Sequence, residues 1–123
     1  MPNPRQALGK RGEVEAARLL KKKGYRILQQ NYRTPVGEID IIAREKKTIV
    51  FIEVKARSST GYGHPKLAVT ALKQRRISMA ALCYLKETGQ TRAKARFDVV
   101  SVLASDPMPQ IEIVRNAFEL AYP

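Results

Sequence analysis

The sequence predicts an α/β fold in a single domain, residues 1–123, in which helices pack on a mixed β-sheet. The chain has 123 residues of which 44% are hydrophobic, enough for one core with little room for a second domain. Runs rich in β-branched residues alternate with two segments of helical period. Together these segments give the element order α-β-β-β-α-β-β.

The first helix is expected over residues 5–23, after Pro4 and before Gly24. Its small and apolar residues fall on one side, and Glu13 falls among them. A carboxylate there is unexpected, because charged residues are almost never fully buried without a partner. The residues alone leave two roles open for Glu13: a place in a functional site, or capping or pairing with a lysine.

Three strands follow, over Tyr25–Gln29, Val36–Arg44 and Thr48–Arg57, and they are expected to form an antiparallel meander. The polar, glycine-rich segment 57–65 comes next and is expected to be a loop placed to touch substrate. Within it, Tyr62 could stack on an unpaired base.

A second helix is expected over residues 66–87. The strand Arg96–Leu103 follows it and should run parallel to the third strand after a right-handed crossover. Residues 104–110 form a loop, and Ile111–Val114 a short final strand at an edge of the sheet.

Acidic residues lie in the middle of the two most apolar strands. If Lys46 and Lys47 form a two-residue hairpin loop, Asp40 falls opposite Glu53. Directly opposed Cβ atoms lie roughly 4.5–5.5 Å apart, so these carboxylates repel unless a proton or a cation lies between them. Lys55 follows on the same face as Glu53.

This set of residues fits a site for Mg²⁺ or Mn²⁺, which bind oxygen ligands through one or two carboxylates. Such a metal polarises a phosphate and lowers the pKa of a bound water, while Lys55 can orient that water or stabilise the charge of the transition state. The competing interpretation is that Asp40 and Glu53 form ordinary ion pairs with Lys55 or an arginine. Glu38 either pairs with Lys55 or extends the acidic site.

The net charge of +12 indicates a polyanionic partner, most simply nucleic acid. No apolar run reaches the ~18 residues of a membrane span, and no secretory signal is visible, so we expect no membrane partner and a cytoplasmic location. Cys83 and His64 are the only residues of their types, which excludes an internal disulfide and a zinc cage.

Phosphate contacts are expected from basic and polar residues after the third strand and on the second helix. These residues are Arg57, Lys73, Gln74, Arg75 and Arg76. The alternative for any one of them is a place on a solvated helix face. Asp98 is expected to make a structural pair with an arginine.

Four sequence blocks carry a resemblance that covers residues 8–118. They are Gly9-x-x-Gly12-Glu13-x-x-Ala16, Gly37-Glu38-Ile39-Asp40-Ile41-Ile42, Phe51-Ile52-Glu53-Val54-Lys55-x-Arg57 and Arg96-Phe97-Asp98-Val99-Val100. Together they resemble the YraN-like family of small bacterial proteins, within the PD-(D/E)xK nuclease superfamily of restriction endonucleases and archaeal Holliday-junction resolvases.

The resemblance implies a restriction-endonuclease-like domain in which Asp40, Glu53 and Glu13 bind Mg²⁺ and Lys55 assists the attacking water. It also makes Gln74 a polar helix residue near the metal. Ile39 stands where the name-giving proline of the superfamily would be, a departure common in this degenerate motif.

The expected function is therefore that of a metal-dependent endonuclease. The absence of a recognisable sequence-reading motif favours shape-selective cleavage, with DNA favoured over RNA as partner. The resemblance to resolvases is compatible with a homodimer. The alternatives are a non-catalytic nucleic-acid-binding module acting with partners, and a basic protein of the ribosome or of an anionic surface, which would leave the buried acids unexplained.

Overall fold

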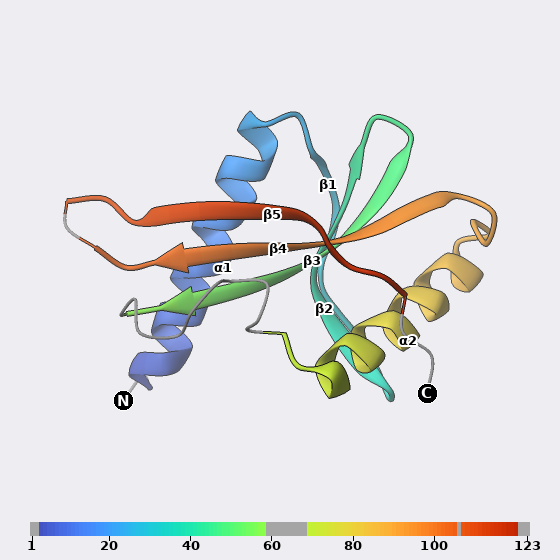
Figure 1. Cartoon of the computed structure of the whole chain (residues 1–123), viewed down its shortest axis with the longest axis horizontal. Helices are drawn as coiled ribbons and strands as arrows, with labels where there is room; N and C mark the ends of the chain where they lie inside the picture. The colour runs from blue at the N-terminus through green and yellow to red at the C-terminus, as the bar shows by residue number, and fades with distance from the viewer. Residues whose placement is uncertain (1–2, 59–68, 106, 121–123) are drawn as a thin grey trace.

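The computed structural model describes residues 3–58, 69–105 and 107–120, and its framework is a five-stranded mixed sheet with a helix on each face (Figure 1). The strand order is β1-β2-β3-β4-β5. In chain order the elements are α1 (Pro4–Lys22), β1 (Arg26–Thr34), β2 (Gly37–Glu45), β3 (Thr48–Arg57), α2 (Ala71–Glu87), β4 (Lys94–Leu103) and β5 (Gln110–Phe118).

The predicted topology is confirmed. Strands β1, β2 and β3 form an antiparallel meander, and β4 pairs with β3 in parallel after α2. β5 returns antiparallel to β4 and forms one edge of the sheet. The pairing of Glu45 with Thr48 shows that the hairpin register inferred from the sequence is correct.

The bounds of β1, β5 and α2 differ from the predicted bounds by more than two residues. β1 and β5 extend beyond the predicted ranges 25–29 and 111–114, because pairing with a neighbouring strand continues into polar residues. α2 begins at Ala71 rather than at residue 66: Thr70 is extended and its side chain caps the helix by accepting a hydrogen bond from the Lys73 backbone N–H. Residues 66–68, and the part of the predicted loop that holds Tyr62 and His64, lie outside the described residues.

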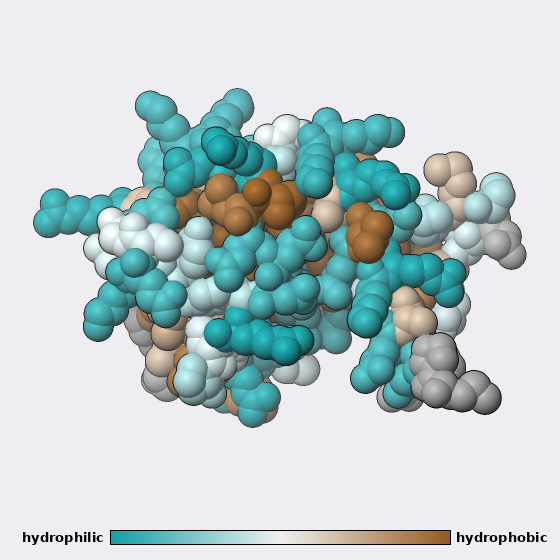
Figure 2. Space-filling view, turned by 180° about the vertical axis from the view of Figure 1, so that it is seen from behind, coloured by the Kyte–Doolittle hydropathy of each residue, from teal (hydrophilic) through white to brown (hydrophobic). Residues whose placement is uncertain are grey.

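Each face of the sheet has its own core. On the α2 side, Phe51 lies among Tyr84, Phe97 and other buried aromatic and aliphatic side chains. On the α1 side, Leu20 of the helix packs on buried aliphatic side chains of the strands. The reverse of the Figure 1 view is mainly hydrophilic around a limited apolar area (Figure 2), as expected for a chain in which 28% of the residues are charged.

α1 approaches the sheet closely at Gly12. A Cβ atom at this position would lie 2.8 Å from the Cβ of Ala56, near the end of β3. The absence of a side chain therefore brings the helix against the strand, and it fixes the place of the next residue, Glu13.

Strand β2 departs from strict alternation at Asp40. Alternation predicts that Ile39 shares a face with Ile41, yet Ile39 packs in the α2-side core with Ile42, and Ile41 packs in the α1-side core. On the neighbouring strand Asn31 has a φ of 53°, between two residues paired with β2. Strict alternation along β2 is therefore interrupted between Ile39 and Ile41.

Asp98 makes a structural pair, as predicted. Its fully buried carboxylate accepts hydrogen bonds from Arg96 Nε at 3.0 Å, Tyr25 Oη at 3.0 Å and the Asn116 backbone N–H at 2.9 Å. Arg96 also binds Glu45 at 2.7 Å. This network ties β2, β4 and β5 to Tyr25, the residue before β1.

Neither helix in the described ranges combines the length and hydropathy needed to cross a membrane.

Candidate active site

Asp40 and Glu53 come together where the pairing between β2 and β3 stops. The last paired residues are Ile41 and Ile52, and the two carboxylates occupy the next position on each strand. Asp40 Oδ2 accepts a hydrogen bond from the backbone N–H of Val54 at 2.8 Å. The backbone N–H of β3 thus binds the Asp40 side chain instead of a backbone carbonyl of β2, and this bond holds the Asp40 carboxylate against β3.

Glu53 is the most buried of the predicted site residues, with 6% of its side chain exposed. Burial and, secondarily, the charge of Asp40 raise its pKa to about 7, although Lys73 and Lys55 act in the opposite direction. A carboxylate in this environment is held ionised only by nearby positive charge.

The pKa of Asp40 is also raised. Burial is the main cause of its raised pKa, with a contribution from Glu38, while the hydrogen bond from Val54, the charge of Lys73 and a hydrogen bond with Glu53 act to lower it. The two carboxyls therefore interact directly, and together they favour either a shared proton or a cation between them.

Lys73 supplies a positive charge to this pair from the first turn of α2. Its Nζ lies 2.7 Å from Glu53 Oε1. Burial alone would lower the pKa of Lys73, but Glu53, Asp40 and Glu38 outweigh burial and raise it. The sequence predicted Lys73 as a phosphate contact and did not predict this ion pair, which links positions 20 residues apart across an intervening segment.

Glu13 and Lys55 complete the set of predicted catalytic residues. Half-buried Glu13 has a raised pKa, chiefly through burial and then through the charges of Asp40 and Glu38, with Arg33 opposing them. The positive charge of Lys55 lowers the pKa of Glu53. The four residues predicted from the sequence thus lie close enough to interact electrostatically, although they come from three elements.

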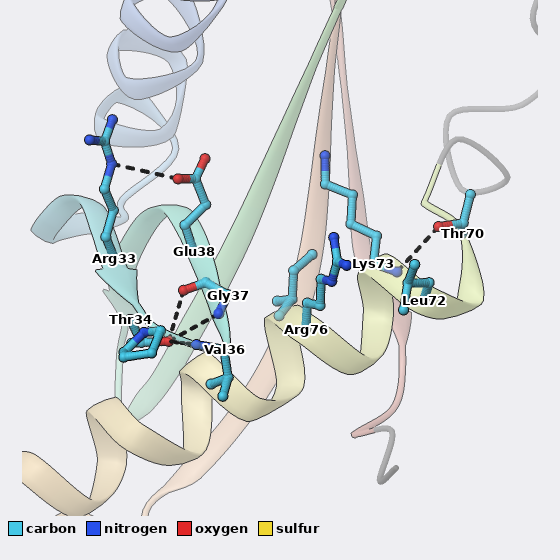
Figure 3. A pocket seen from close by; sticks show the side chains of 11 residues that line it. Arg33, Thr34, Val36, Gly37, Glu38, Thr70, Leu72, Lys73 and Arg76 are labelled. Atoms are coloured by element: carbon cyan, nitrogen blue, oxygen red, sulfur yellow. Dashed lines mark hydrogen bonds and ion pairs between the residues drawn. The ribbon is translucent and has the colours of Figure 1, made fainter.

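A groove opens beside these carboxylates, between the β1–β2 turn and the first turns of α2. Its volume is about 690 Å³, and its cationic lining residues are Arg33, Lys73 and Arg76. Figure 3 shows Arg33 and Glu38 on the strand side and Lys73 and Arg76 on the helix side, with their side chains extending in the same general direction. Arg33 was not among the predicted contacts.

Gly37, which lines this groove, lies very close to the backbone of α2. A Cβ atom on Gly37 would lie 2.4 Å from the backbone oxygen of Arg76, a distance that no side chain can adopt. The β1–β2 turn can therefore pack directly against α2. Thr34 closes the turn, since its Oγ1 accepts hydrogen bonds from the backbone N–H groups of Val36 and Gly37.

The other predicted phosphate contacts lie in different surroundings. Arg57 donates a hydrogen bond to Ser101 Oγ at 3.3 Å, and Gln74 donates one to the backbone oxygen of Val69 at 3.0 Å. Arg75 is exposed on α2 but does not line the groove. Glu38 binds Arg33 at 3.5 Å, and its charge also acts on Asp40 and Glu13.

The donor set fits a hard divalent cation in part. Within residues 3–58, 69–105 and 107–120, no group of three or more His, Cys, Asp or Glu side chains lies close enough to enclose a metal. Two convergent carboxylates are nevertheless sufficient for Mg²⁺, which keeps several waters and binds through one or two carboxylates. Asp40 and Glu53 meet that requirement, and Glu13 is placed near them.

Comparisons with known proteins show which family the chain resembles. A model of the family described as "Uncharacterised protein family UPF0102" matches residues 12–102. A UPF0102 protein of Desulfosudis oleivorans is 57% identical over 119 residues, covering 97% of this chain and 95% of the relative. A UPF0102 protein of Geobacter metallireducens is 56% identical over 117 residues, which cover 95% of this chain and 96% of the relative. The UPF0102 protein GSU0650 of Geobacter sulfurreducens is 53% identical over 116 residues, which cover 94% of this chain and 91% of the relative.

Proposed function

The chain belongs to the UPF0102 family, the YraN-like family of the nuclease-like superfamily, and we propose that it is a metal-dependent endonuclease that hydrolyses phosphodiester bonds of nucleic acid. DNA is the proposed substrate, selected by its shape rather than its sequence. The observation that carries the proposal is the convergence of Asp40 and buried Glu53 at the end of the β2–β3 ladder, with Lys55 on the same strand and a cationic groove alongside.

In this proposal Asp40 and Glu53 hold Mg²⁺ or Mn²⁺, with Glu13 placed near them. When bound, the metal polarises the scissile phosphate and lowers the pKa of a coordinated water. The hydrogen bond from Val54 keeps the Asp40 carboxylate facing Glu53. The pKa of about 7 on Glu53 means that this carboxyl has to lose a proton before it can act as a ligand near neutral pH.

Lys55 is proposed to orient the attacking water or to neutralise charge that develops on the phosphate. It stands two residues after Glu53, on a strand whose backbone is held on both sides by β2 and β4 up to Ile52 and by β4 beyond it. A rigid strand is a suitable base for such a group, because catalytic contacts lose efficiency when their geometry is loose.

Nucleic acid is proposed to approach along the groove and α2. Arg33 and Arg76 point into solvent beside the carboxylates, and Arg75 adds charge on the same helix. Phosphate contacts of this kind position a strand without reading its bases. The net charge of +12 supplies the long-range attraction.

One observation favours a second function. Lys73 already neutralises Glu53, as it would in a nucleic-acid-binding module that works without a metal. Such a module would bind nucleic acid in a salt-dependent and metal-independent manner and would act through partners.

A cleavage assay distinguishes the two. Labelled duplex, single-stranded, flapped and four-way-junction DNA, together with matched RNA, would be incubated with Mg²⁺, Mn²⁺ or EDTA. Metal-dependent cleavage that Lys55→Ala abolishes, and that the matched variant Lys47→Ala at the exposed hairpin turn retains, supports the nuclease. Binding without cleavage in either metal favours the binding module.

A further inference from the structure

Lys73 takes part in two neighbouring features at once. Its ammonium contacts Glu53 at 2.7 Å, while the residue also lines the groove with Arg33 and Arg76. The side chain of Lys73 is 42% exposed and that of Glu53 only 6%. The ion pair is therefore open to solvent on the lysine side and closed on the carboxylate side.

The Lys73 ammonium lies against Glu53 Oε1, one of the carboxylate oxygens that a divalent cation would use. It acts on Asp40 as well as Glu53, and its effect on Glu53 is larger than that of Lys55, so it is the main charge that compensates the carboxylate pair. A metal held by the same two carboxylates would repel this ammonium strongly at such short range. The two cations therefore compete for Glu53.

The backbone lets the lysine leave without disturbing the helix. The Lys73 N–H donates to Thr70 Oγ1 at 3.2 Å, which anchors the first turn of α2 independently of the lysine side chain. A lysine carries its charge on a flexible four-carbon stem, and rotation about that stem is fast in exposed side chains. The groove offers about 690 Å³ into which the ammonium can turn.

We infer that Lys73 exchanges partners: it neutralises Glu53 in the metal-free protein, and it turns into the groove to bind a nucleic-acid phosphate when a divalent cation takes the Asp40–Glu53 pair. The inference rests on the proposed function. It makes Lys73 a positioning residue that couples the two ligands, since each ligand favours the lysine orientation that the other requires.

The first test measures metal affinity without any reaction. Mn²⁺ would be titrated into the full chain and the free ion followed by electron paramagnetic resonance, for wild type, Lys73→Met and Lys73→Arg. Removing the competing charge is expected to tighten Mn²⁺ binding about fivefold or more in Lys73→Met. Lys73→Arg retains a cation and should stay near wild type. Lys86→Met, which removes an exposed charge at the far end of the same helix, should also leave the affinity unchanged.

The second test locates the released lysine. Binding of a labelled DNA duplex would be measured against KCl concentration, in EDTA and in Ca²⁺, an ion that also prefers oxygen ligands. The slope of the logarithm of DNA affinity against the logarithm of KCl concentration should be smaller in magnitude for Lys73→Met than for wild type by about one in Ca²⁺. In EDTA the two slopes should agree.

Each outcome of these two tests either supports or overturns the exchange of partners by Lys73. Tighter Mn²⁺ binding by Lys73→Met together with a metal-dependent change in salt slope supports it. Equal Mn²⁺ affinity in wild type and a folded Lys73→Met overturns the exchange but leaves the proposed nuclease standing. Absence of Mn²⁺ binding in both overturns the exchange and the proposed metal site. An equal loss of slope in EDTA and in Ca²⁺ contradicts the exchange, because Lys73 would then contact DNA without the metal.

Discussion

The carboxylate of Asp40 accepts a hydrogen bond from the backbone N–H of Val54, two residues past the last β3 residue that pairs with β2. The bond joins the two strands where their ladder has ended. It also places Asp40 beside Glu53, so one contact both closes the sheet and aligns the proposed ligands.

This double role can be separated by Asp40→Asn. The amide oxygen can still accept from Val54, so stability should be retained or increased as a buried negative charge is removed. Cleavage should be abolished, and DNA binding should be unchanged or stronger because less negative charge faces phosphates. Thermal melts and binding titrations would measure this. If Asp40→Asn cleaves DNA at the wild-type rate, Asp40 is not part of the active site.

Asp98→Asn provides the contrast. This carboxylate is fully buried and paired with Arg96, so its neutralisation should cost about 3 kcal/mol of folding free energy. The same chemical change is thus expected to have opposite effects on stability at positions 40 and 98.

The pKa of Glu53 predicts how stability depends on pH. Its folded-state pKa of about 7 lies above the ordinary value of 4.5, so the folded protein binds the proton more tightly than the unfolded chain. The resulting stabilisation is complete below about pH 4.5 and is lost as pH rises through about 7, with a size on the order of 3 kcal/mol. Melting temperatures of the metal-free protein between pH 5 and pH 8 would record this fall.

Glu53→Gln should flatten that dependence, and Mn²⁺ should raise the melting temperature of wild type more at pH 8 than at pH 5. Glu112→Gln, at an exposed position of β5, serves as the control and should behave like wild type. A pH profile that is the same in Glu53→Gln and wild type would refute the assignment to Glu53.

Much of the fold could be predicted because local patterns agree with it. The two lysines of the hairpin loop fixed the β2–β3 register, and the crossover rule fixed the direction of β4. The start of α2 was placed too early because Val69 and Thr70 are compatible with a helix in sequence, while Thr70 acts as its cap.

The site was harder to predict in full. Asp40, Glu53 and Lys55 are close in sequence and lie on paired strands, so the hairpin register was enough to group them. The Glu53–Lys73 ion pair and the part played by Arg33 depend on how α2 packs against the β1–β2 turn. Contact between elements distant in sequence leaves no periodic signal. Gly37, whose close approach to Arg76 sets that packing, was the available clue.

Gly37→Ala tests that packing. The added Cβ would overlap the Arg76 backbone oxygen, so we expect a loss of about 1–3 kcal/mol and a weaker interaction with DNA as the groove distorts. Gly9→Ala is the matched control: a Cβ there meets nothing within 4 Å, and replacing a helical glycine should stabilise the protein by about 0.5–1 kcal/mol. Chemical denaturation measures both. Equal stability of Gly37→Ala and wild type would show that the turn does not pack on α2 as described.

The groove is tested by the double variant Arg33→Ala with Arg76→Ala. Affinity for DNA should fall uniformly across sequences, and the salt slope should decrease by about two. Removing two exposed charges far from the groove, with Lys86→Ala in the last turn of α2 and Arg92→Ala in the segment that follows the helix, should have a smaller effect. Equal effects of the two pairs would mean that DNA responds to the overall charge and not to the groove.

The site itself is tested most directly by crystals of the full chain grown with Mn²⁺ and measured for anomalous scattering. We predict a manganese peak within about 2.5 Å of carboxylate oxygens of both Asp40 and Glu53, with the Lys73 ammonium moved away from Glu53. A map without a peak at these carboxylates, with Lys73 still bound to Glu53 at saturating Mn²⁺, would contradict the proposed metal site.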